Sequence, residues 1–166
     1  MTCLFELSIA LLITLLNGFF VMAEYSLVRI RKSRLDELIR QGKSRANTVL
    51  KMSEKLDTYL SATQLGITAS SLLLGWFGGP LLAEMFRGMF GVSAGTWYDH
   101  SLVFACAFLI IVFLHVVFGE LVPRTIALGK VEQVAMAVAY PLVFFHYLLY
   151  PLVVLFNRIS HAVLCL

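Results

Sequence analysis

The sequence predicts an all-helical membrane protein that crosses the bilayer three times. Of its 166 residues, 60% are hydrophobic and only 14% are charged, whereas soluble domains average about 25% charged residues. Four stretches contain no Asp, Glu, Lys or Arg: residues 7–23, 58–83, 100–119 and 133–157. The hydrocarbon core of a bilayer, about 30 Å thick, is spanned by roughly 20 mainly apolar helical residues. Each stretch is therefore a candidate membrane helix.

The first helix is expected over residues 4–28 and is expected to remain in the membrane. A signal peptide opens with basic residues and closes at a small-residue cleavage site. Here Glu6 precedes the apolar run, no basic residue opens the chain, and Glu24 followed by a basic segment closes it. We therefore interpret this segment as a permanent transmembrane helix.

The basic segment at residues 29–57 sets the expected orientation. It carries nine Lys and Arg and four Asp and Glu, a net charge of +5. Basic segments beside membrane helices lie on the cytoplasmic side, so we expect residues 29–57 and the C-terminus in the cytosol, at the plasma (inner) membrane. A nucleic-acid partner is not expected, because no separate soluble domain carries the basic run.

Two short amphipathic helices are expected within residues 33–57. Ser33 can cap the first of them and Gly42 can end it. Apolar residues recur at helical spacing in both: Leu35, Leu38 and Ile39, then Ala46, Val49, Leu50 and Leu56. Their basic faces fit two arrangements equally well. The helices either contact anionic headgroups or form a packed cytosolic hairpin.

The remaining apolar stretches give two more crossings and one ambiguous helix. Residues 60–83 and 100–128 are expected to cross outward and then back inward. The last helix, expected over residues 133–158, is interrupted by Pro141 and Pro151 and has basic residues near both ends. Positive charge at both ends fits a helix in the inner interface better than a crossing helix. We therefore predict three crossings followed by an interfacial helix.

Polar side chains within the predicted spans are candidates for a functional site, because such groups are costly in a membrane. Asn17 and Glu24 are seven residues apart and share one face of the first helix. The second helix carries a run of oxygen-bearing side chains: Ser61, Thr63, Gln64, Thr68, Ser70 and Ser71. Ser and Thr also serve as contacts between membrane helices, and without the carboxylates we would favour that role.

The third helix contains a proline next to a carboxylate. Pro123 has no N–H, so in an α-helix the carbonyl of Gly119 loses its partner. Irregular backbone at membrane depth is tolerated where it is buried or lines a cavity. A free carbonyl beside Glu120 would form a pair of cation ligands. An ordinary kink explains the sequence equally well, with the carbonyl bonded to a serine or water and Glu120 paired to Arg124.

The ligand chemistry narrows the choice of ion. Carboxylate, hydroxyl, amide and carbonyl oxygens suit hard cations such as Mg²⁺ or Ca²⁺, whereas softer metals prefer grouped His or Cys. Cys3, Cys106 and Cys165 have neither disulfide-like nor metal-site spacing. His115 is interpreted as a structural histidine.

Three ordered motifs resemble the CorC/cyclin-M family of Mg²⁺ transporters. They are LNGFF at residues 16–20 with EYSLVR at residues 24–29, QLGIT at residues 64–68, and HVVFGELVPR at residues 115–124. The similarity extends over essentially the whole chain. One departure is Arg124, where the family usually has lysine, and the charge is retained.

The resemblance implies a homodimeric domain surrounded by membrane lipids, with three crossings per subunit and a belt-like interfacial helix. It implies an inward-open Mg²⁺ site formed by Ser26, Ser70, Ser71, Gly119 and Glu120. The cavity is expected to be lined by Asn17, Glu24, Gln64 and Pro123. Family members continue into CBS domains that bind ATP. The chain ends at Leu166 without them, so we expect it to be a fragment and ATP regulation to lie elsewhere.

The predicted function is Mg²⁺ export by alternating access around intramembrane cavities of the dimer, with coupling to Na⁺ left open. No covalent chemistry is implied, so an enzyme is not expected. One alternative is a membrane-anchored Mg²⁺ sensor that regulates another transporter. The other is a structural membrane scaffold that binds no ion.

Overall fold

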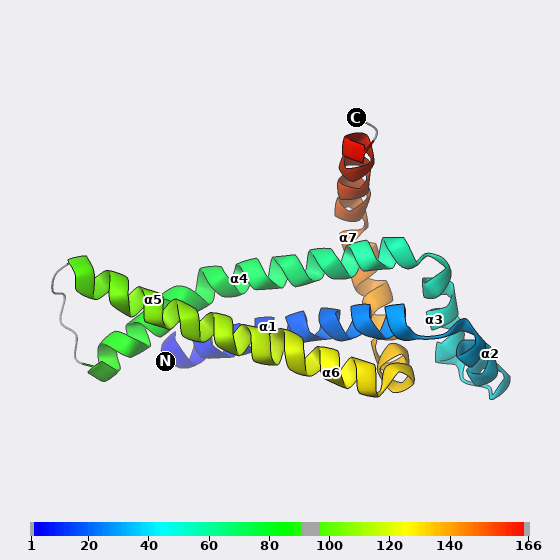
Figure 1. Cartoon of the computed structure of the whole chain (residues 1–166), viewed down its shortest axis with the longest axis horizontal. Helices are drawn as coiled ribbons and strands as arrows, with labels where there is room; N and C mark the ends of the chain where they lie inside the picture. The colour runs from blue at the N-terminus through cyan, green and yellow to red at the C-terminus, as the bar shows by residue number, and fades with distance from the viewer. Residues whose placement is uncertain (1, 91–96, 165–166) are drawn as a thin grey trace. The chain divides into compact units, whose positions relative to one another are not determined.

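The computed structural model describes residues 2–90 and 97–164, and every regular element among them is helical (Figure 1). The elements in chain order are α1 (Thr2–Arg29), α2 (Lys32–Arg40), α3 (Ser44–Glu54), α4 (Leu56–Phe90), α5 (Trp97–Leu114), the π-helical turn η1 (His115–Leu121), α6 (Val122–Gly129) and α7 (Val131–Leu164). No strand occurs in the described residues. The predicted all-α class is therefore confirmed.

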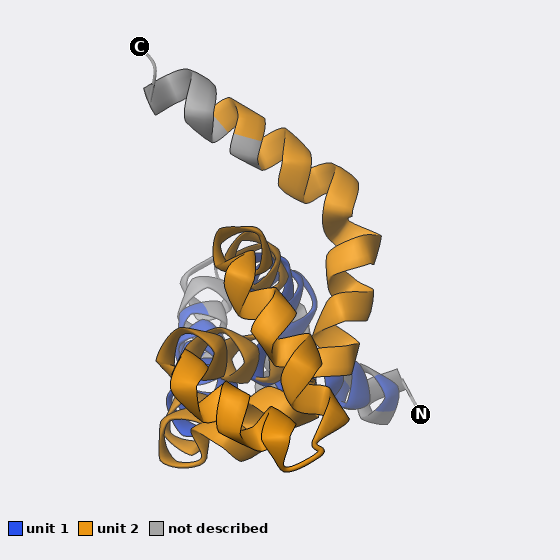
Figure 2. Cartoon of the chain, turned by 90° about the vertical axis from the view of Figure 1, so that its right-hand side faces the viewer, with its two compact units in different colours: residues 1–18, 68–122 blue, residues 19–67, 123–166 orange. Residues whose placement is uncertain are grey.

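The chain divides into two compact units, coloured blue and orange in Figure 2. Unit 1 comprises Met1–Gly18 and Thr68–Val122, and unit 2 comprises Phe19–Ile67 and Pro123–Leu166. Each unit combines segments that are far apart in the sequence.

Three helical segments of the described chain are long and apolar enough to cross a membrane: Leu7–Arg29, Phe108–Gly129 and Val131–Phe156. The first two correspond to the first and third predicted crossings. In the part of the chain that the structure describes, α4 is not among them, and its first half carries the Ser, Thr and Gln residues noted above. The third segment belongs to α7, so placing α7 in the interface stays a prediction.

Two helix boundaries differ from the predictions. α4 begins before residue 60 and runs past residue 83 as one helix to Phe90. Interruption by Gly and Pro is tolerated in apolar helices because neighbouring groups satisfy the freed backbone atoms. α2 begins at Lys32, so its N-cap is Arg31 without a side-chain hydrogen bond. The predicted cap at Ser33 is therefore wrong.

The segment at residues 33–57 contains two short helices, α2 and α3, as predicted, but α3 ends at Glu54, so Leu56 begins α4 and is not part of the second short helix. Their buried residues include Leu35 and Leu38 in α2 and Ala46, Val49 and Met52 in α3. Gly42 ends α2 in the left-handed region with φ +80°, a conformation that glycine adopts without steric cost. The amide of Gly42 donates to the carbonyl of Ile39 over 2.9 Å. The position of these helices beside a membrane remains a prediction.

An aromatic cluster packs α1, α4 and α7 together within unit 2. The ring centroid of Phe20 lies 5.2 Å from that of Phe19 and 5.1 Å from that of Phe145. Gly66 of α4 faces the same ring, and a Cβ atom built on Gly66 would lie 2.6 Å from ring atoms of Phe20. Only glycine therefore permits this approach of α4 to α1.

Candidate functional site

The predicted break in the third apolar helix is a π-helical turn, η1, at His115–Leu121. The amide of Val122 donates to the carbonyl of Val117, five residues back, which is the π register. Single π turns within α-helices occur frequently at functional sites. Pro123 predicted irregular backbone at this place, on the basis of α-helical hydrogen bonding. The π-helical type of the turn was not predicted.

Asn17 of α1 binds this turn directly, within unit 1. Its Nδ2 atom donates to the carbonyl oxygen of Gly119 over 2.8 Å. Asn17 is only 1% exposed, and its Oδ1 atom is buried without a hydrogen-bond partner in the described part of the chain. The carbonyl that Pro123 was expected to free is therefore engaged by an amide. The Asn17 Oδ1 atom is the oxygen at this contact that the described part of the chain leaves without a hydrogen-bond partner.

Gly119 is required by the closeness of its neighbours. A Cβ atom at this position would lie 3.0 Å from Nδ1 of His115 and 3.2 Å from Nδ2 of Asn17. Such a contact would push the asparagine amide away from the carbonyl it binds. The glycine thus keeps the turn and α1 in contact.

His115 extends this polar cluster to α4. Its Nε2 atom lies 3.1 Å from Oγ of Ser71, and its Nδ1 atom is buried without a hydrogen-bond partner in the structure as described. From the sequence alone, His115 is interpreted as a structural histidine. Its position four residues before Gly119 could have indicated a place in the cluster, because residues four apart lie on one face of a helix.

The other predicted ligands of unit 1 differ in exposure. Ser70 is buried, with 2% of its surface exposed, whereas Glu120 is exposed on the isolated chain. Adjacent residues of a helix point about 100° apart. Ser70 and Ser71 therefore present their hydroxyls in different directions from α4.

The remaining predicted residues belong to unit 2. Ser26 is fully buried and its hydroxyl donates to the carbonyl of Ala23 over 3.1 Å, which leaves its lone pairs for another partner. Gln64 donates from Nε2 to Oε1 of Glu24 over 3.3 Å. Pro123 is buried. The structure thus joins Asn17 to Gly119 and Glu24 to Gln64, while the complete ligand set stays a prediction.

Arg124 makes a different contact from the one in the kink alternative. Its guanidinium carbon lies 4.6 Å from the ring centroid of Tyr25, within unit 2. Stacking of this kind stabilises an arginine at an interface without consuming its charge.

The candidate ligand atoms of this cluster are oxygens together with the imidazole of His115. No three His, Cys, Asp or Glu side chains gather in the described residues. A cation held at the cluster would therefore depend on one carboxylate combined with hydroxyl, carbonyl and amide oxygens. Such a set favours Mg²⁺ or Ca²⁺ over transition metals.

Comparison with protein families identifies the family to which the chain belongs. The profile of the cyclin M transmembrane N-terminal domain matches residues 7–166. The chain belongs to this cyclin M family, which includes the UPF0053 proteins. The resemblance inferred from the three sequence motifs is confirmed.

Several bacterial proteins share this cyclin M domain. UPF0053 protein YugS of Bacillus subtilis is 41% identical over 143 residues, which are 86% of this chain and 33% of the relative. UPF0053 protein YhdT of the same organism is 42% identical over 151 residues, 90% of this chain and 32% of the relative. A Mycobacterium tuberculosis protein, Rv1841c, is 38% identical over 156 residues, 94% of this chain and 44% of the relative. The chain thus spans about a third of the length of the Bacillus relatives.

Proposed function

We propose that this cyclin M domain is the membrane part of a Mg²⁺ exporter. The observation that carries the proposal is the hydrogen bond between Asn17 and the Gly119 carbonyl in the π-helical turn, next to Glu120. This contact brings the Asn17 amide to the Gly119 carbonyl, and the carboxylate of Glu120 follows one residue later in the same turn. Family membership supports a role in metal-ion transport or homeostasis.

The proposed ligands are Ser26, Ser70, Ser71, the Gly119 carbonyl and Glu120. Mg²⁺ demands near-octahedral oxygen coordination and gives up its water reluctantly. A site with neutral hydroxyls and one carboxylate would offset the lost water while keeping the net charge low enough for release. Asn17, Glu24, Gln64 and Pro123 are assigned to the surrounding cavity.

The proposal includes a homodimer. Glu120 is exposed on the single chain, and a carboxylate facing lipid is costly. Large apolar side chains of α5, the helix that precedes η1, are also exposed, among them Phe113 at 66%. A second copy that covers this face would shield the carboxylate and enclose a cavity. Alternating access around two such cavities would then move the ion, with coupling to Na⁺ as a separate question.

Flux measurements separate the proposal from its alternatives. The chain would be reconstituted in proteoliposomes with a Mg²⁺-sensitive dye, beside Glu120→Ala and the control Glu54→Ala. Export predicts flux for the wild type and for Glu54→Ala and none for Glu120→Ala. Calorimetric binding of Mg²⁺ without flux would support a sensor. Neither binding nor flux would support a scaffold and overturn the proposal.

A further inference from the structure

Two cavities lie where α7 begins, both within unit 2 and each about 460 Å³ in volume. The first is lined by α2, by the segment before it and by Val131 and Glu132 of α7. The second is lined by the α2–α3 connection, by the start of α3 and by Gln133, Met136 and Ala137 of α7. The two cavities have equal volumes, so we compare the charges of the residues that line them.

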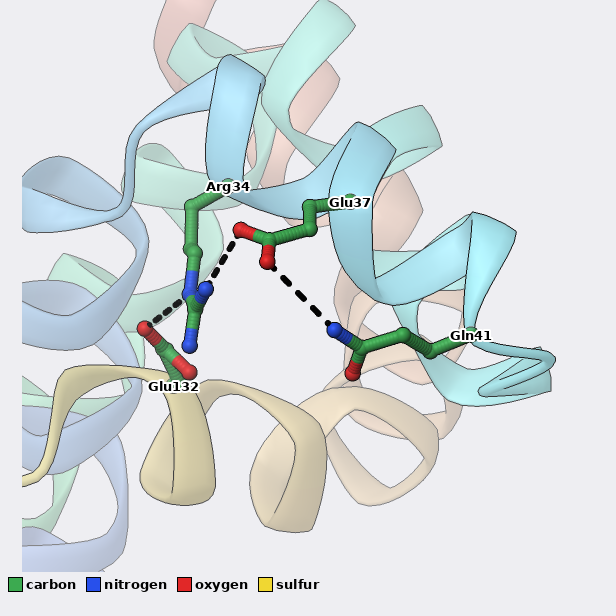
Figure 3. A network of polar contacts seen from close by, with 4 residues as sticks. All are labelled: Arg34, Glu37, Gln41 and Glu132. Carbon is green, nitrogen blue, oxygen red and sulfur yellow. Dashed lines mark hydrogen bonds and ion pairs between the residues drawn. The ribbon is translucent and has the colours of Figure 1, made fainter.

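The first cavity is lined by three arginines, Arg29, Arg31 and Arg34, and by two carboxylates, Glu37 and Glu132, which offset most of its positive charge. Arg34 donates from Nε to Oε1 of Glu132 over 2.6 Å and also pairs with Glu37, which in turn accepts from Gln41 (Figure 3). The hydrogen bonds that Arg34 donates to Glu132 and then to Glu37 raise the pKa of Arg34 above its ordinary value. An arginine held between two carboxylates does not attract a further anion strongly.

The second cavity is cationic and has no carboxylate in its lining. Lys43 and Arg45 supply two positive charges, and Ser44 and Gln133 supply neutral polar groups. The guanidinium carbon of Arg45 lies 5.6 Å from the ring centroid of Tyr140. That contact orients the arginine without neutralising it. The cavity therefore complements an anion.

An exposed apolar stripe of α7 starts at this cavity. Ala137, which lines the cavity, is followed at helical spacing by Tyr140, Phe144, Tyr147 and Leu148. Tyr140 is 52% exposed, Phe144 64% and Tyr147 72%. The packed face of the helix carries other residues, such as Val138 and Leu142. One face of α7 thus passes from a cationic cavity to bare apolar surface.

We propose that this face binds an anionic phospholipid. Lys43 and Arg45 hold the headgroup phosphate, and the acyl chains lie along the stripe from Tyr140 to Leu148. A soluble phosphate would use only the cavity, and a zwitterionic lipid would bring a headgroup cation toward Lys43 and Arg45 together with its phosphate. The combination favours a lipid with net negative charge, because basic residues near a membrane surface attract anionic headgroups. The inference uses no residue of the Mg²⁺ site, so it stands or fails independently of the proposed transport.

Native mass spectrometry of the full chain in detergent tests this proposal. The titrants are dioleoylphosphatidylglycerol, dioleoylphosphatidylcholine and soluble glycerol phosphate. Two double variants are compared: Lys43→Gln with Arg45→Gln in the cavity, and Arg40→Gln with Lys51→Gln outside it. Both remove two positive charges from exposed positions. Helical circular dichroism confirms the fold of each.

The wild type is expected to bind phosphatidylglycerol at least about tenfold more tightly than phosphatidylcholine. The cavity variant is expected to lose this affinity by roughly 10- to 30-fold, and the control variant by less than about twofold. Equal losses in both variants would show diffuse surface charge and overturn the site. Equal affinity for both lipids, or glycerol phosphate bound as tightly as the lipid, would also overturn it. The headgroup comparison on the wild type is decisive even where a variant misfolds.

A second measurement asks whether the apolar stripe contacts another copy of the chain. If Tyr140→Ser combined with Phe144→Ser dissociates a dimer, the stripe is assigned to a second copy and the lipid assignment is overturned.

Discussion

The side chain of Asn17 and the backbone of Gly119, 102 positions apart in the sequence, are joined by a buried hydrogen bond of 2.8 Å. The bond gives the carbonyl of an irregular turn a partner that does not come from its own helix. In an apolar environment an unpaired carbonyl is costly. Asn17 therefore stabilises η1, and with it the position of Glu120 one residue further on.

Asn17→Ala is predicted to destabilise the domain and to weaken Mg²⁺ binding. Loss of the amide leaves the buried Gly119 carbonyl without its donor, which costs about 1–3 kcal/mol. Groups that orient metal ligands typically contribute 10- to 100-fold to affinity, so the dissociation constant for Mg²⁺ should rise by about tenfold or more. Thermal unfolding in detergent and calorimetric titration would measure the two effects.

The matched control for Asn17→Ala is Thr14→Ala, three residues earlier on α1. The Thr14 hydroxyl donates to the carbonyl of Ala10 within its own helix over 2.9 Å. Its loss should change stability by less than about 1 kcal/mol and leave Mg²⁺ affinity unchanged. Equal effects of the two variants would contradict the orienting role of Asn17.

Gly66→Ala is predicted to destabilise the domain, whereas Gly75→Ala in the same helix is not. The added methyl at Gly66 would overlap the ring of Phe20, which is 2% exposed and held by Phe19 and Phe145. Overpacking of this kind costs about 1–3 kcal/mol. A Cβ at Gly75 meets no atom within 4 Å. Melting temperatures of both variants test this prediction. A stable Gly66→Ala variant would show that the rings of the aromatic cluster move to accommodate the added methyl group.

Most of the helical content could be predicted because its signals are local, although the start of α2 and the extent of α4 differ from the predictions. Charge-free length, basic flanks and Gly42 each act within a few residues, and they predicted the helical class and the two short helices. The motif at residues 115–124 also located the irregular turn, because Pro123 cannot donate a hydrogen bond.

The contacts within the site could not be predicted in the same way. The bond between Asn17 and Gly119 depends on which faces of two distant helices meet, and no spacing in one sequence records that. The π register depends on an extra residue in a helical turn, whereas the proline argument assumes an α-helix. His115 was set aside because a lone histidine has no partner in the sequence, and Ser71 becomes its neighbour only through folding.

The topology prediction is that Lys51 and the C-terminus lie on the same, cytosolic side. The basic segment at residues 29–57 places Lys51 inside, and an interfacial α7 would keep the chain there. Lys51→Cys and a cysteine added after Leu166, each in a background without the native cysteines, would be labelled with a membrane-impermeant maleimide in intact cells and in inverted vesicles. Because α7 is long enough to cross, modification from opposite sides would contradict three crossings followed by an interfacial helix.

The final prediction concerns the ion site itself. Glu120→Ala and Ser70→Ala should each abolish Mg²⁺ binding or weaken it by more than about 100-fold, without unfolding the domain. A near-octahedral site does not tolerate the loss of one oxygen, and groups beyond direct coordination already contribute 10- to 100-fold. Glu24→Ala should reduce affinity by less than about tenfold, because Glu24 accepts a hydrogen bond from Gln64 and is assigned to the cavity wall. Ca²⁺, which requires longer bonds and more ligands, should bind more weakly than Mg²⁺.

Calorimetric titration of the wild type and these variants decides the assignment, with the elution profile as the folding control. Glu54→Ala removes an exposed carboxylate from α3 and should bind Mg²⁺ like the wild type, which separates loss of a ligand from loss of net charge. Wild-type affinity in Glu120→Ala would mean that the π-helical turn has a structural role only. If Glu120→Ala loses binding and Ser70→Ala keeps it, the ion binds beside the π-helical turn. Ser70 of α4 is then not one of its ligands.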